Sequence, residues 1–135
     1  MMAPVKEKLK ALIVEDEVDI CILLTGILRK KNLQTTFVNN IKAAKETLLL
    51  QHPAILFIDN NLPDGHGIDI LDEIKHDNPA LKIIMITADD TQDNKDKALK
   101  AGVDFFIGKP FTRDAINKMV DNLLSSNPAT VTAYS

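Results

Sequence analysis

Side chains that could do chemistry come directly after short apolar segments of this chain. They are Glu15 and Asp16 after residues 11–14, Asp59 after Ile55–Ile58, Thr87 after residues 83–86, and Lys109 after Gly108 and residues 105–107. Two carboxylates about 5 Å apart repel each other by roughly 3 kcal/mol at an effective dielectric of 20. A cluster of carboxylates therefore needs a cation, and a site of oxygen ligands suits a hard divalent ion such as Mg²⁺.

The apolar segments are typical of strands that are covered on both faces, because most of them are continuous rather than alternating. The predicted strands are residues 11–14, 35–38, 55–58, 83–86 and 105–107, and helical spacing predicts helices around 20–28, 41–49, 70–74, 93–101 and 116–124. This alternation predicts an α/β fold with a doubly wound, five-stranded parallel sheet. Ligands of such sheets bind beyond the carboxyl ends of the strands, where the acids, the hydroxyl and the lysine would converge.

The segments between these elements predict specific turns and caps. After Asp59, Pro63 fixes a turn, and Gly65 and Gly67 permit positive φ, so that the chain can fold back without blocking the carboxylate. Asn39 and Asn40 precede a helix, and asparagine is a common capping residue. Both are therefore predicted to cap that helix.

Composition limits the classes of protein that need to be considered. A chain of 135 residues with 45% hydrophobic residues and a net charge of −3 predicts one domain, 9–124, with no nucleic-acid surface. Residues 1–8 are predicted to be an extension, and 125–135 a flexible tail or the start of a linker. Cys21 is predicted to be a reduced core residue. The absence of a signal peptide and of an apolar span predicts a soluble, cytoplasmic protein with no membrane partner.

Three other kinds of site fit the sequence poorly. A calcium loop starting at Asp59 would need a ligand where Pro63 lies, a glycine where Asp64 lies and a bidentate Glu where Ile70 lies. A dehalogenase-like phosphatase would need an acid where Asn61 lies. No GxxxxGK segment is present to cradle a nucleotide phosphate.

The motifs, taken together, resemble the receiver domain of the response regulators of two-component signalling. The resemblance covers residues 9–124 and rests on the segments LIVEDE, LFIDNNLPDGHG, MITA and GKPF, in this order and spacing. It implies the (βα)5 receiver fold, which is flavodoxin-like. The chain departs from the usual pattern at Gly108, where a larger residue is common, and at Glu15, where Asp is more usual.

The resemblance implies a role for each residue that matches a family motif. Asp59 would be the phosphoacceptor, Lys109 would neutralise the phosphoryl oxygens, and the Thr87 hydroxyl would donate a hydrogen bond to one of them. Phe106 would be the aromatic switch residue. The bond between Lys109 and Pro110 would be cis.

The resemblance also implies a metal site and a hydrolysis site around the phosphoacceptor. Asp16 and Asp59 would ligate Mg²⁺, or Mn²⁺, directly, Glu15 would act through a water molecule, and Asn61 would contribute its backbone carbonyl. The side chains of Asn61 and Asp89 would modulate the lifetime of the aspartyl phosphate, because both can hold a water molecule.

A domain of this kind would accept a phosphoryl group from a phosphohistidine of a histidine kinase or histidine phosphotransfer protein. It would catalyse only its own phosphorylation and dephosphorylation, and would dimerise transiently when phosphorylated. The signal would pass to a downstream effector protein or to an output domain. Two alternatives stay open: a phosphate-independent, receiver-like scaffold, and a receiver fragment of a larger regulator or hybrid kinase.

Overall fold

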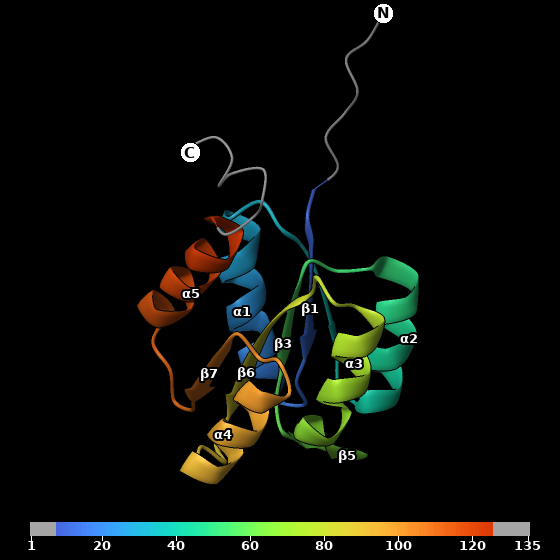
Figure 1. Ribbon diagram of the computed structural model, residues 1–135. Coiled ribbons are helices and arrows are strands. Elements are labelled where there is room, and N and C mark those ends of the chain that lie inside the picture. Colours follow the sequence, from blue (N-terminus) through green and yellow to red (C-terminus); the bar gives the residue numbers. More distant parts are fainter. Residues whose placement is uncertain (1–7, 126–135) are drawn as a thin grey trace, which may run out of the picture.

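A parallel sheet of five strands forms the centre of the computed structural model, which describes residues 8–125 (Figure 1). The strands are β1 (Lys10–Val14), β2 (Gln34–Val38), β3 (Ile55–Ile58), β6 (Lys82–Thr87) and β7 (Phe105–Gly108). Their order across the sheet is β2-β1-β3-β6-β7, and every neighbouring pair is parallel. The predicted sheet is confirmed, and four strands extend one or two residues beyond the apolar segments.

Helices connect these strands in the predicted alternation. They are α1 (Val18–Lys30), α2 (Ile41–Gln51), α3 (Leu71–Asp77) after a 3-10 turn η1 (Gly67–Ile70), α4 (Gln92–Lys100) and α5 (Arg113–Ser125). Helix α5 includes the first residue of the predicted tail, whereas the rest of that tail and residues 1–7 of the predicted extension lie outside the described residues. No helix within residues 8–125 has the length and apolar character needed to cross a bilayer.

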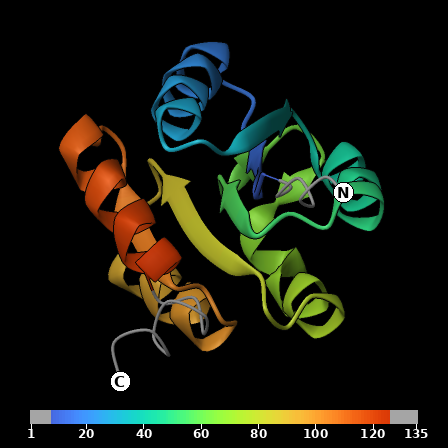
Figure 2. The same ribbon diagram turned by 90° about the horizontal axis from the view of Figure 1, so that it is seen from above.

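The helices cover both faces of the sheet (Figure 2), and an apolar core lies on each face. Helices α1 and α5 pack on one face with Ala11 and Ile13 of β1, while α2, α3 and α4 pack on the other face with Leu12 and Val14. Because successive strand residues point to opposite faces, β1 and β3 are buried on both sides. This double burial holds the carboxyl ends of the two strands in fixed positions.

One of the two asparagines before α2 caps the helix as predicted, and the other does not. Asn40 does cap α2, since its Oδ1 accepts a hydrogen bond of 2.8 Å from Ala43 N. The prediction for Asn39 is wrong, because its Nδ2 donates to the backbone carbonyl of Glu15 at 2.9 Å. The Cys21 thiol donates to the same carbonyl at 3.4 Å, and Cys21 is a free, buried core residue as predicted. Burial raises the pKa of this thiol to about 11.

The turn after Asp59 contains a small antiparallel hairpin that the sequence did not predict. Its strands are β4 (Asn61–Leu62) and β5 (Gly65–His66). Gly65 adopts the positive φ that a glycine permits, of 149°. Gly67 does not adopt positive φ; glycine is required there because a Cβ atom would lie 2.4 Å from the backbone oxygen of Asp59.

The hairpin is tied to the rest of the fold by Asp64. Its two carboxylate oxygens accept hydrogen bonds from the backbone of Ile41 at 2.8 Å and of Lys42 at 3.0 Å. These two donors belong to the free N–H groups at the amino end of α2. Their hydrogen bonds hold the pKa of Asp64 below its usual value.

The close approach at Gly67 predicts that Gly67→Ala destabilises the protein by about 1–3 kcal/mol, because the new methyl group overlaps the backbone beside Asp59. Gly26→Ala is the matched control, since a Cβ atom on Gly26 in α1 meets no atom within 4 Å. That control should stabilise the protein by about 0.5–1 kcal/mol. Urea denaturation of both variants measures the difference, and equal effects would contradict the predicted overlap.

Candidate functional site

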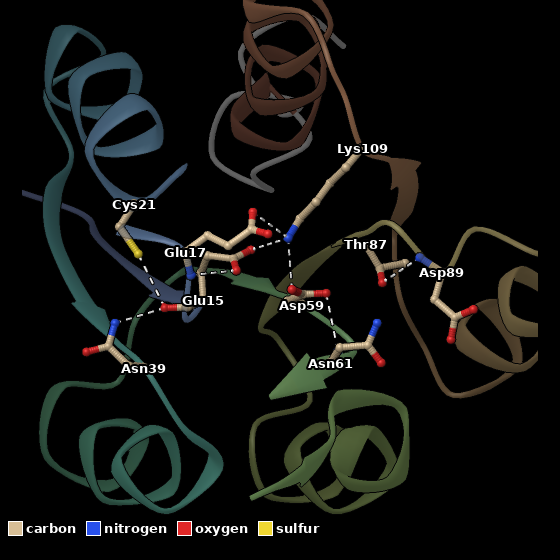
Figure 3. A network of polar contacts seen from close by, with 9 residues as sticks. All are labelled: Glu15, Glu17, Cys21, Asn39, Asp59, Asn61, Thr87, Asp89 and Lys109. Atoms are coloured by element: carbon tan, nitrogen blue, oxygen red, sulfur yellow. Dashed lines mark hydrogen bonds and ion pairs between the residues drawn. The ribbon is translucent and has the colours of Figure 1, made fainter. Parts of the chain in front are cut away.

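The carboxyl ends of four strands bring the predicted chemical residues together (Figure 3). Glu15 follows β1 and Asp59 follows β3, and these two strands are neighbours in the sheet. Thr87 is the last residue of β6, and Lys109 follows β7. The residues come from distant parts of the sequence but share one edge of the sheet.

Lys109 is the cation at the centre of this cluster. Its Nζ lies 2.9 Å from Asp59 Oδ2, 3.0 Å from Glu15 Oε2 and 3.3 Å from Glu17 Oε2. Burial alone would lower the pKa of the ammonium, but the hydrogen bonds to Asp59 and Glu15 raise it above its ordinary value. Lys109 is therefore charged at any physiological pH and is anchored by three carboxylates.

Both oxygen atoms of the Asp59 carboxylate are held by hydrogen bonds, directly after the carboxyl end of β3. Lys109 binds Oδ2, and the backbone N–H of Asn61 donates to Oδ1 at 3.2 Å. The Asp59 backbone N–H donates to Val14 O at 3.0 Å and fixes the residue to the end of β1. With 4% of its surface exposed, the carboxylate is shielded from bulk water but lies within the cluster of polar groups.

Glu15 is the most perturbed acid of the cluster. Burial is the main cause that raises its pKa to about 7, and the negative charge of Asp59 adds to it. The backbone N–H of Glu17, which donates to Glu15 Oε1 at 3.0 Å, and the ammonium of Lys109 act in the opposite direction. Without a bound metal ion, the protonated and ionised forms of Glu15 are therefore similarly populated near pH 7.

Thr87 connects the end of β6 to the loops on either side of the cluster. Its side chain is fully buried, and Oγ1 accepts a hydrogen bond of 3.1 Å from the backbone of Asp89. The Thr87 carbonyl accepts a hydrogen bond of 2.9 Å from Lys109 N. The half-buried Asp89 lies on the far side of Thr87 from Asp59, whereas Asn61 is beside Asp59 (Figure 3).

Phe106 lies in β7, and Pro110 follows the lysine that comes directly after this strand. Phe106 is half-buried and packs against the core formed with α2, α3 and α4. The peptide bond from Lys109 to Pro110 is cis, as predicted. Both residues therefore adjoin the segment that carries the lysine.

The carboxylates fit a divalent cation. Oxygen atoms of Glu15, Asp16 and Asp59 lie within 4.8 Å of one another, and Asp16 is exposed, so the group is reachable from solvent. An all-oxygen donor set is what Mg²⁺ and Mn²⁺ prefer. Asn61 is exposed next to Asp59, where its backbone carbonyl could add a further oxygen.

The comparison with known families agrees with this geometry. The model of the response regulator receiver domain matches residues 11–121. The chain belongs to this family. Solved structures share the receiver fold: a CheY-like receiver domain protein from Methanospirillum hungatei JF-1 is 24% identical, with a TM-score of 0.81, over 88% of this chain and 96% of that one.

Relatives of this receiver domain are regulators of greater length. The protein PilR of Pseudomonas aeruginosa is 37% identical over 85% of this chain, but the match spans 26% of PilR. TcrX of Mycobacterium tuberculosis, a probable transcriptional regulatory protein, is 29% identical over 78% of this chain and 45% of its own length. The solution structure of the beryllofluoride-activated NtrC4 receiver domain dimer is 26% identical, with a TM-score of 0.80, over 84% of this chain and 94% of that one.

Sequence reasoning gave no role to two residues of this receiver site. Glu17 contacts Lys109. Residues 15–17 are three successive acids, and the first and third both face Lys109. This spacing of two residues is a signal that could have identified Glu17. Asn60 is buried, its Oδ1 accepts a hydrogen bond of 3.0 Å from Ile68 N, and its carbonyl accepts one of 2.8 Å from Gly67 N. It thus shapes the loop beyond Asp59.

The raised pKa of Glu15 predicts a pH-dependent stability. A carboxyl group with a folded pKa of about 7 and an ordinary value of 4.5 stabilises the fold most below pH 4.5, and this stability is lost as the pH rises through 7. In EDTA, the melting temperature of the wild type should therefore fall relative to that of Glu15→Gln between pH 5 and pH 8. Glu46→Gln removes an exposed carboxylate of α2 and is the control; parallel curves for wild type and Glu15→Gln would contradict the prediction.

Proposed function

We propose that Asp59 of this receiver domain accepts a phosphoryl group from a phosphohistidine of a histidine kinase or histidine phosphotransfer protein. An Asp59 carboxylate oxygen forms the new bond to phosphorus while the phosphorus–nitrogen bond breaks, and the imidazole leaves with the electron pair. The observation that carries the proposal is the contact of 2.9 Å between Lys109 Nζ and Asp59 Oδ2. It places a permanent positive charge where phosphoryl oxygens would gather.

The other groups around Asp59 support the same role. Phosphoryl transfer depends mainly on positioning and on neutralisation of charge. The Thr87 oxygen accepts its bond from Asp89 N, which leaves the hydroxyl proton able to donate to a phosphoryl oxygen. The complete set of acids, threonine and lysine favours phosphorylation over the alternative of a phosphate-independent scaffold.

The acids would hold Mg²⁺ or Mn²⁺ during the transfer. Asp16 and Asp59 are the proposed direct ligands, together with the backbone carbonyl of Asn61, and Glu15 would contribute through a water molecule. When bound, such an ion neutralises charge on the phosphoryl oxygens. The protein fixes the ligands because Glu15 and Asp59 sit at the ends of two buried neighbouring strands.

The phosphorylated domain would signal through its surface rather than through catalysis on another substrate. Thr87 would move toward the phosphoryl group, and Phe106 would turn from its half-buried position toward the interior. The responding surface would comprise α4, β7 and α5. Helix α4 buries only Ala98, whereas α5 buries Ile116, Val120 and Leu123, which favours α4 as the mobile one of the two helices.

The partner of this surface would be a downstream effector protein or an output domain. The chain spans less than half of the length of PilR and of TcrX. The dimer named for the NtrC4 receiver domain supports transient dimerisation on activation. We place the domain in the cytoplasm, without direct binding of nucleic acid or membrane.

Replacement of the proposed phosphoacceptor predicts two effects. Asp59→Asn should abolish phosphate incorporation from a small phosphodonor with Mg²⁺, where the wild type gives an acid-stable, alkali-labile phosphate. It should also raise the melting temperature in EDTA by a few degrees, because it removes one of the three carboxylates that contact Lys109, which keeps its contacts with Glu15 and Glu17.

Asp72→Asn, which removes an exposed carboxylate of α3, is the matched control and should change neither property. Phosphate that still appears on Asp59→Asn would refute the assignment of the phosphoacceptor. A melting temperature that is unchanged or lower would refute the mutual repulsion of the acids while leaving the phosphoacceptor in place.

The lifetime of the phosphoryl group should depend on the two polar side chains near the line of water attack. Asn61→Met and Asp89→Leu should each slow the loss of phosphate at saturating Mg²⁺ by a few-fold, about 1 kcal/mol in the barrier. Asn61 should have the larger effect, because its backbone already contacts Asp59 Oδ1 at 3.2 Å. Unchanged decay in both single variants and in the double variant would mean that neither side chain aligns the water.

A further inference from the structure

Glu17 does not do what its position in the chain would suggest. It is the N-cap residue of α1, where the side chain of a Ser, Thr, Asp or Asn usually accepts a hydrogen bond from the helix. The Glu17 side chain makes no such capping bond. Its carboxylate instead extends to Lys109 Nζ, at a distance of 3.3 Å (Figure 3).

This contact is the outermost of the three that Lys109 makes. The side chains of Glu15 and Asp59 are 3% and 4% exposed, whereas that of Glu17 is 59% exposed. A groove of about 400 Å³ adjoins the contact, and Glu17 and Lys109 are the two charged residues in a lining that is otherwise apolar. Of the three carboxylates that contact Lys109, that of Glu17 is therefore the one that is exposed to solvent.

We propose that Glu17 is a specificity-determining residue for the phosphodonor, because its carboxylate competes with incoming phosphoryl oxygens for Lys109 and disfavours small donors with two negative charges. The proposal rests on the proposed function of Asp59. Coulomb repulsion is proportional to the charge of the donor, so a dianion is disfavoured more than a monoanion. The backbone N–H of Glu17 donates a hydrogen bond of 3.0 Å to Glu15 Oε1, and this bond fixes the backbone from which the Glu17 side chain extends.

Two small phosphodonors differ in net charge near neutral pH and can test this dependence on charge. Acetyl phosphate is a dianion, and phosphoramidate is a monoanion. With either donor, an Asp59 oxygen forms the bond to phosphorus. The phosphorus–oxygen bond to acetate breaks in the first case, and acetate leaves with the electron pair. The phosphorus–nitrogen bond breaks in the second case, and ammonia leaves with the electron pair, because the nitrogen of the monoanion is already protonated.

The test compares Glu17→Gln with Asp19→Asn, at saturating Mg²⁺. Asp19 is exposed in the first turn of α1, so its replacement makes the same change of charge two residues away. Glu17→Gln should raise the rate constant with acetyl phosphate about threefold, or about 0.6 kcal/mol in the barrier, and that with phosphoramidate less than twofold. Asp19→Asn should change both rates little and equally, and added KCl should reduce the advantage of Glu17→Gln.

The outcomes separate this proposal from the proposed function. If Glu17→Gln matches Asp19→Asn with both donors while phosphorylation of the wild type proceeds, the role of Glu17 is refuted and that of Asp59 stands. A loss of rate with both donors would show that Glu17 positions Lys109 productively, which also refutes competition. If neither donor phosphorylates the wild type or Glu17→Gln, the proposed role of Glu17 fails, and incubation with a phosphohistidine donor then decides the proposed function of Asp59 separately.

Discussion

The balance between one ammonium group and several carboxylates controls the whole carboxyl edge of the sheet. Lys109 contacts Asp59, Glu15 and Glu17, so a single positive charge is shared among three carboxylates. Glu15 responds with a raised pKa, because burial and the charge of Asp59 both oppose its ionisation. Such a pocket retains an excess of negative charge, which a divalent cation can neutralise, and this neutralisation is what the proposed transfer of a phosphoryl group to Asp59 would require.

The fold maintains this unfavourable cluster because several independent contacts hold the backbone that carries it. β1 and β3 are buried on both faces, and Asp59 N is fixed to Val14 O. The loop beyond Asp59 is held by Asn60 and by the close approach of Gly67. The carboxylates cannot separate without disturbing the two cores, so burial of apolar side chains offsets their repulsion.

The same hydrogen bonds that build the site link it to the surface proposed for signalling. Thr87 bonds through its hydroxyl oxygen to Asp89 and through its carbonyl to Lys109. A shift of Thr87 would therefore act on the loop before α4 and on the end of β7 at once. Helix α4, whose one buried residue is Ala98, can adjust at little cost, whereas α1 and α5 share the opposite core and are joined by the ion pair of Lys31 and Asp121, 2.6 Å long.

The sequence by itself determined the alternation of strands and helices, the membership of the family and the residues that gather at one sheet edge. The alternation depends on local periodicity, and the gathering of residues depends on the fact that parallel strands share a carboxyl end. Membership of the family rests on the motifs that resemble those of receiver domains. Only the tertiary structure decided which neighbour each side chain meets. Glu15 and Glu17 face Lys109 with Asp16 between them, Asn39 supports Glu15 instead of capping α2, and Asp64 holds the amino end of α2. Gly67 is needed for a close approach to Asp59 rather than for positive φ. The physical reason is common to all of these: each contact joins segments that are far apart or separated by a turn, and its geometry is set by how the two cores pack against the sheet.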